Sequence, residues 1–140
     1  MNFKKMITLI SILTVSTYSH AQDTSKSIII SADSALFQRV EIEPQFPGGN
    51  AAWIKYLQSN LNPEVPINNN AKTGSYNVVI KFIVSKDGSI SNLVPVTHFG
   101  YGMEEEVIRV LKKGPNWMPG VQNGRKVIAY RSQMVTFFVP

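Results

Sequence analysis

The sequence predicts an α+β domain in which two helices pack on one face of a three-stranded antiparallel sheet. Three observations predict it. Residues 75–85 alternate between apolar and more polar side chains, as a half-buried strand does. Residues 103–113 repeat apolar side chains at helical spacing, and residues 126–139 form a second long strand pattern. With 44% apolar and 16% charged residues in 140 positions, the composition suits one domain with a buried core.

The first residues are expected to lie outside that core. Lys4 and Lys5 precede an apolar run over residues 6–15, and small residues lead to Ala21, which is typical of a secretory signal cleaved before Gln22. The run is short for a membrane span and is interrupted by hydroxyl side chains, so a cleaved signal is favoured over a retained anchor. We therefore expect a signal peptide over residues 1–21, a tether over 22–35 and the folded domain over 36–140. Without cysteine, an exported domain depends on packing alone.

The folded domain is expected to begin with an additional short strand over residues 36–43. A corner with the sequence PQFPGG follows over residues 44–49. Gly48 and Gly49 suit positive φ angles there, and Asn50 is expected to cap the first helix.

The first helix has one apolar stripe. Trp53, Leu57 and Leu61 share it at helical spacing. Pro63 and Pro66 are expected to end this helix and, with the asparagine run that follows, to prevent another from forming.

A hairpin follows the asparagine-rich loop. The alternating strand over residues 75–85 leads into Lys86-Asp87-Gly88, a tight turn in which Gly88 suits the left-handed conformation. Residues 89–99 are expected to return as the second strand of the sheet.

The second helix and the last strand complete the domain. Met103, Val107, Val110 and Leu111 are expected on the buried face of the helix over residues 103–113, with three glutamates in a solvated first turn. After a corner at Trp117, expected to be a core side chain, an Asn-Gly turn leads into a third strand over residues 126–139. Because a helix separates the second and third strands, the third is expected to return antiparallel beside the first, as a sheet edge.

The sequence contains few of the residues that an enzyme, a metal site or a cofactor site would need. Beyond the signal the chain has one histidine, His98, no cysteine and no Gly-x-Ser-x-Gly motif, so we expect neither an enzyme nor a metal site nor a cofactor. Gly48 and Gly49 could bind an anion at a helix start, but a corner that needs positive φ is the favoured interpretation. Basic residues are scattered despite a net charge of +5, so nucleic acid is not an expected partner. No small-molecule substrate is predicted either.

Four segments in order resemble the C-terminal domain of TonB, in the form found in exported proteins of Bacteroidetes-type bacteria. They are FPGG before a helix, VVIKFIVSKDGSIS over residues 78–91, GMEEEVIRVLKK over 102–113 and PNWMPGVQNGRKV over 115–127. The resemblance covers residues 38–139. It implies two helices on a three-stranded antiparallel sheet and a periplasmic location. It also implies that the last strand pairs with a short extended segment, the TonB box, of an outer-membrane receptor.

The resemblance implies a function in TonB-dependent transport across the outer membrane. Family members transmit inner-membrane energy to receptors, and strand addition at a sheet edge is a general mode of peptide binding. The expected partner is thus a receptor or other envelope protein. The expected contact residues lie within 126–136 and are Lys126, Ile128, Tyr130, Arg131, Gln133 and Val135.

Two departures from the family pattern leave alternatives open. The chain shows no Pro-rich rod, and its signal is expected to be cleaved, so it would bind a receptor without transmitting energy to it. Asn62 also stands where the family has a tyrosine before proline. The alternatives are a structural domain that self-associates through the same edge as a homodimer, and an energy transducer with a retained N-terminal anchor.

Overall fold

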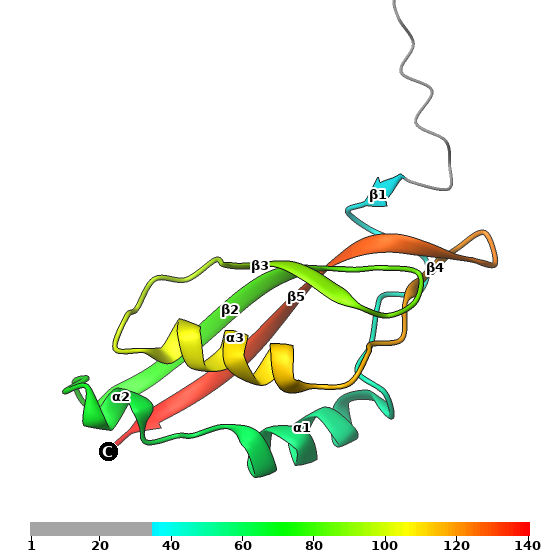
Figure 1. The fold of residues 1–140 in the computed structure, drawn as a ribbon. Helices are drawn as coiled ribbons and strands as arrows, with labels where there is room; N and C mark the ends of the chain where they lie inside the picture. Colours follow the sequence, from blue (N-terminus) through cyan, green and yellow to red (C-terminus); the bar gives the residue numbers. More distant parts are fainter. Residues whose placement is uncertain (1–34) are drawn as a thin grey trace, which may run out of the picture.

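Two long strands form the centre of the sheet in the computed structural model, which describes residues 35–140 (Figure 1). Strand β2 (Gly74–Val84) pairs antiparallel with β5 (Arg125–Val139), in an unbroken register from Gly74 opposite Val139 to Val84 opposite Ala129. Strand β3 (Ile90–Pro95) pairs with the other side of β2. The last strand therefore lies beside the first long strand, as the sequence predicted. The expected signal and nearly all of the expected tether lie outside the described residues.

Two short strands enlarge the sheet. Strand β1 (Leu36–Phe37) runs parallel to β5, and β4 (Gly120–Gln122) forms a hairpin with β5 through the Asn-Gly turn. The α+β class is confirmed, but the expected count of three antiparallel strands is wrong, because residues 35–140 form a sheet of five strands in which β1 pairs in parallel. The Asn-Gly turn reverses the chain so tightly that the residues before it pair as well.

The expected strand over residues 36–43 is much shorter in the structure. Only Leu36 and Phe37 form a strand, and single bridges join Ile42 to Val121 and Gln45 to Met118. Pro44, between the two bridged residues, has no N–H group to donate, so a continuous ladder cannot form through it.

The described residues form three helices, all on the same side of the sheet in Figure 1. Helix α1 (Gly49–Asn60) lies toward the margin formed by β5, and α3 (Met103–Lys113) lies over β2. Helix α2 (Val65–Asn68) contradicts the expectation that Pro66 prevents helix formation. Proline is tolerated in the first helical turn, where its missing N–H would have no partner.

Helix α1 begins two residues earlier than expected and without a side-chain cap. Gly48, with φ of 83°, is the N-cap residue, and no side chain bonds to the first turn. The expectation that Asn50 caps this helix is therefore wrong. The left-handed conformation at Gly48 turns the chain directly into the helix, so Asn50 already lies inside it.

The core lies between β2 and the helices. On β2 the alternate residues Val78, Ile80, Phe82 and Val84 are fully buried, as the period-two pattern predicted. The four apolar side chains expected on the buried face of α3 are buried as well. They are Met103, Val107, Val110 and Leu111.

The glutamates at the start of α3 differ from expectation. Glu104 and Glu106 are only 5% and 7% exposed, so the prediction of a solvated first turn is wrong for both. The Glu104 carboxylate accepts hydrogen bonds from the N–H groups of Phe99 (2.8 Å) and Gly100 (3.1 Å). Glu104 thus holds the loop that leads into its own helix, whose positive dipole end also favours the charge.

Glu106 ties α3 to the end of α1. Its carboxylate accepts a hydrogen bond from the Asn62 N–H (2.7 Å) and two from the Arg109 guanidinium (2.6 and 2.8 Å). Arg109 also donates to the Asn60 carbonyl (2.7 Å). The Arg109 hydrogen bonds lower the pKa of Glu106 below its ordinary value, so the carboxylate stays charged in the folded protein.

Candidate functional site at the free edge of the last strand

Strand β5 has an unpaired side along most of its length. Opposite β2, strand β1 covers only Ile128 and Ala129. Between Tyr130 and Val139, no strand within residues 35–140 pairs with that side of β5. A strand that lacks a neighbour presents N–H and C=O groups ready to pair with another chain.

Hydrogen bonds of β2 determine which residues of β5 present these groups. Val79 bonds toward β3, since its carbonyl accepts from the Val96 N–H (2.8 Å) and its N–H donates to Thr97 Oγ1 (3.0 Å). Its neighbour Ile80 therefore bonds toward β5, where it lies opposite Gln133. The groups that point away from β2 are consequently those of Ser132, Met134, Thr136 and Phe138. We refer to residues 132–138 as the free edge.

A largely apolar groove of about 670 Å³ runs beside the free edge. Helix α1 forms its other wall with Trp53, Ile54 and Leu57 among its residues. Several apolar side chains here are unusually exposed for their type: Ile54 is 48% exposed, Met134 55% and Phe138 74%. A bound extended segment would cover these side chains.

A smaller, more polar pocket of about 190 Å³ continues the groove. The two share Asn50, Trp53 and Gln133, and the aromatic rings of Phe46, Trp53 and Trp117 line the pocket. The three ring centroids lie 5.3 to 5.8 Å from one another, so the rings form a packed cluster. Trp117 is 3% exposed, which fits the expected core side chain, and it lines the pocket as well.

The turn between β2 and β3 holds Trp117 in place. Gly88, with φ of +86°, accepts a hydrogen bond from the Trp117 N–H at 2.8 Å. A Cβ atom on Gly88 would lie 2.0 Å from the Trp117 carbonyl oxygen. The expected glycine turn is confirmed, and its close approach to Trp117 explains why no larger residue fits.

Arg131 brings an unsatisfied donor to the pocket. Its Nε atom is buried and has no hydrogen-bond partner among the described residues. Glu43 lines the same pocket, but no ion pair joins it to Arg131 within the described chain. A buried N–H group of this kind is rare in folded proteins and favours an incoming acceptor.

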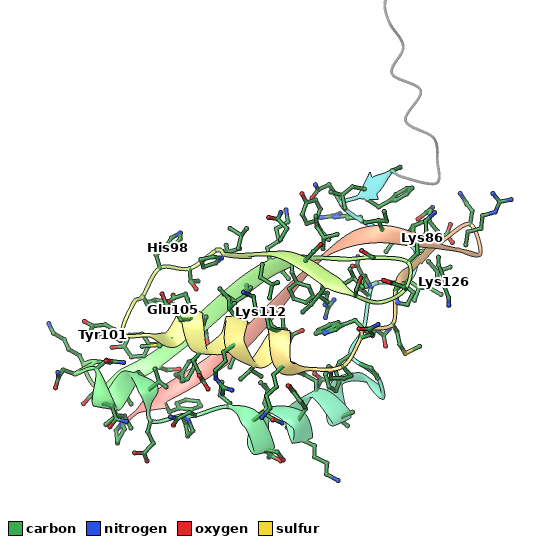
Figure 2. The ribbon with its side chains drawn as sticks, in the orientation of Figure 1. Lys86, His98, Tyr101, Glu105, Lys112 and Lys126 are labelled. Atoms are coloured by element: carbon green, nitrogen blue, oxygen red, sulfur yellow. The ribbon has the colours of Figure 1, made fainter. Side chains whose placement is uncertain are left out.

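The structure places two of the predicted contact residues outside the free edge. Lys126 lies opposite Val121 in the β4–β5 hairpin, near the end of the sheet (Figure 2). Ile128 lies opposite Leu36 of β1. Intramolecular strands thus already pair at both positions.

The other four predicted residues lie next to the free edge or within it. Arg131 and Gln133 both line the pocket, and Gln133 also lines the groove. Val135 is 4% exposed and belongs to the core. Tyr130 packs under Lys81, whose Nζ lies 4.0 Å from the ring centroid. The structure therefore brings Arg131 and Gln133 together and places Tyr130 beside a cation.

Sequence reasoning missed the outward-pointing residues of the free edge and the wall that α1 contributes. Strand alternation was the signal that could have identified the outward-pointing residues. Val135 and Phe137 belong to the core, so the side chains of the even-numbered residues between 132 and 138 lie on the opposite face of the sheet. No sequence signal indicated that Ile54 would face β5 across a groove.

The structure also bears on the other residues that the sequence raised as possible sites. No three His, Cys, Asp or Glu side chains in this range lie close enough to hold a metal ion, and His98 is exposed in the loop before α3 (Figure 2). No helix in the same range is long and apolar enough to cross a membrane. Gly48 and Gly49 adopt positive φ, as a corner requires.

The fold and the free edge define an α+β domain with an open sheet margin beside an apolar groove. Searches of the sequence against models of protein families and against curated proteins found no match. The resemblance to the TonB C-terminal domain therefore stays a prediction.

Proposed function

We propose that the protein is a periplasmic binding module of the TonB C-terminal type. The free edge pairs with an extended peptide segment of an outer-membrane receptor or another envelope protein, in the setting of TonB-dependent transport. The proposal rests on one observation: the outward backbone groups of residues 132–138 lie beside an apolar groove, and no strand within the described residues pairs with them.

Backbone pairing would supply much of the affinity. Ser132, Met134, Thr136 and Phe138 each offer an N–H donor and a C=O acceptor to a guest strand. Each hydrogen bond gained contributes about 0.5–1.5 kcal/mol net. The Met134 carbonyl accepts only a long 3.3 Å bond from the Gln133 side chain, which a guest strand replaces. Alternate guest side chains enter the groove against α1 and supply selectivity.

The composition of the free edge supports its use as a binding surface. Natural proteins protect unused edges with charged side chains or proline. Residues 132–138 have the sequence SQMVTFF, without a charge or a proline. A long, apolar, uncharged margin would favour aggregation unless something covers it.

Self-association through the same margin is the second candidate, because the exposed Met134 and Phe138 would be buried between two copies. Sedimentation analysis distinguishes it: a concentration-independent monomer excludes this candidate. An energy transducer with a retained anchor is the third. N-terminal sequencing of the exported protein tests it, because a start at Gln22 excludes it.

The main test is an NMR titration of the labelled protein with a capped octapeptide of alternating threonine and valine. We expect the largest amide shifts at Ser132, Met134, Thr136 and Phe138. N-methylation of alternate peptide nitrogens provides a matched control. One methylated set removes the donors that face β5 and abolishes binding, while the other set leaves binding intact. Shifts confined to residues away from β5 and α1 would refute the proposal.

A further inference from the structure

We infer that residues 27–31 of this chain pair with the free edge when no guest is bound, so that a guest strand must displace them. This inference rests on the proposed function and concerns the regulation of the same surface. The segment has the sequence SIIIS and precedes β1, outside the described residues. Three features support the inference: the place where the chain enters the domain, the length of the connection, and the match between the segment and the free edge.

The chain enters the domain on the same side of β5 as the free edge. Strand β1 pairs with Ile128 and Ala129 on the side of β5 that faces away from β2, and the free edge continues along that side (Figure 1). The residues before Leu36 are therefore tethered at one end of the free edge. A short tether gives an effective concentration on the order of millimolar, so even weak pairing would fill the edge.

The connection is long enough to reach the free edge. Along β5, Ser132 lies about 13 Å from Ile128, given the usual rise of a strand. Ile30 precedes Leu36 by six positions, which span up to about 20 Å when extended. The difference leaves length for a turn, so Ile30 can lie beside Ser132.

The same length determines the direction of the segment. In a parallel segment, Ile30 would be the residue farthest along the edge, so pairing would stop near Ser132. In an antiparallel segment, the residues before Ile30 continue from Ser132 toward Phe138, which places Ile28 beside Met134. Only the antiparallel direction covers the free edge, and we therefore infer that direction.

The segment matches the apolar character of both faces of the free edge. On the helix side lies the groove with Ile54 and Leu57 in its wall, and on the opposite face Met134 and Phe138 are exposed. Side chains alternate along a strand, so three successive isoleucines direct apolar groups to both faces at once. Isoleucine is also among the residues most enriched in strands.

Neither the segment nor the free edge carries a charge. Residues 27–31 and 132–138 contain apolar, hydroxyl and amide side chains only. Their pairing buries apolar surface and joins backbone groups without removing a charge from water. Covering an edge with another part of the chain is one of the ways in which natural proteins protect it. The segment thus supplies the protection that the edge lacks in its own sequence.

A resident segment lowers the apparent affinity for a guest. If residues 27–31 cover the edge about nine-tenths of the time, only about one-tenth of the molecules can bind, and the apparent Kd rises about tenfold. A guest that pairs along all of residues 132–138 can overcome this competition, whereas a shorter one gains too few hydrogen bonds. The segment therefore sets a threshold for binding.

The first test compares affinities for the threonine-valine octapeptide by isothermal titration calorimetry. The exported protein, residues 22–140, is compared with a serine variant that combines Ile28→Ser, Ile29→Ser and Ile30→Ser. We expect the serine variant to bind the peptide about tenfold more tightly. The matched control combines Lys26→Ser with Asp33→Ser, which flank the isoleucines, and should change the affinity by less than about twofold. Thermal unfolding confirms that each variant is folded.

The second test locates the segment directly. Because the chain has no cysteine, Thr24→Cys accepts a single nitroxide spin label. Antiparallel pairing predicts that the label broadens the NMR amide signals of Thr136 and Phe138 most strongly. The broadening should disappear in the serine variant and in excess octapeptide. A mixture of spin-labelled protein with isotope-labelled protein that lacks the nitroxide is the control, and broadening in that mixture would refute pairing within one chain.

The outcomes separate this inference from the proposed function. If the octapeptide binds the free edge of the exported protein and of the serine variant with equal affinity, the resident segment is refuted and strand addition by a guest stands. If the octapeptide binds neither protein, the proposed function is refuted, and the inference that rests on it fails as well. Broadening that is equally strong in the serine variant would also overturn the inference.

Discussion

Replacing Gly88 with alanine is expected to be among the most damaging single-atom changes in the domain. Gly88 has a φ of +86°, and a Cβ atom there would lie 2.0 Å from the Trp117 carbonyl oxygen. The clashing atom belongs to the backbone, so no side-chain rotation relieves the overlap. Either the β2–β3 turn or the Trp117 corner must move.

The cost follows from three terms. A non-glycine residue in the left-handed region costs about 1–2 kcal/mol. Moving the turn away from Trp117 weakens the 2.8 Å hydrogen bond between their backbones, at about 1 kcal/mol. Displacing Trp117 also disturbs its packing on Phe82, 5.0 Å away between ring centroids. We expect a total loss of about 3–5 kcal/mol, a large fraction of a typical domain stability.

Gly124→Ala is the matched control for this variant. Gly124 has a similar φ of +70°, but a Cβ atom there meets nothing within 4 Å. Its substitution should cost about 1–2 kcal/mol from backbone strain alone. Urea denaturation followed by tryptophan fluorescence and circular dichroism measures both. Equal losses in the two variants would refute the argument from close approach.

Two further predictions concern acid stability and the free edge. Because its folded pKa is lowered, chiefly by hydrogen bonds from Arg109, Glu106 contributes stability that is fully present above its ordinary pKa of 4.5 and is lost as the pH falls through the folded value. Glu106→Gln should cost about 1 kcal/mol at pH 7, since Arg109 is half exposed, and should flatten the acid side of the stability curve measured by urea denaturation. Met134→Pro should abolish peptide binding in the NMR titration yet unfold at a urea concentration close to wild type. The Met134 N–H points away from β2, and proline is tolerated at such edge positions because the missing N–H has no partner there. If this variant unfolded, the Met134 N–H would have to bond within the domain, which would contradict the proposal.

The sequence predicted the central part of the fold well because strong periodicity marks elements that bury one face. The alternation along β2 and the helical spacing from Met103 to Leu111 both reflect side chains that the structure buries completely. Such patterns depend on local geometry alone. The turns at Gly88 and at Asn123-Gly124 were predictable for the same reason, since positive φ restricts the residues that can occupy them.

Features that depend on contacts between distant segments were not predictable. Glu106 is buried because it accepts a hydrogen bond from the Asn62 N–H, 44 residues away, and no local rule indicates that partner. The pairing of Leu36 with Ile128 likewise brings together residues near opposite ends of the domain. The groove was missed for this reason: it exists only where α1 meets β5.

The parallel pairing of β1 with β5 has a consequence for any strand that binds beside it. A guest held by main-chain bonds can slide by two residues and keep every side chain on its original face, so backbone pairing alone leaves alignment ambiguous. Leu36 and Phe37 already occupy the pairing positions at Ile128 and Ala129, at one end of the free edge. A guest strand that slid toward them would lose backbone hydrogen bonds to β5 without forming new ones. The position of β1 therefore determines where the paired part of a bound sequence ends.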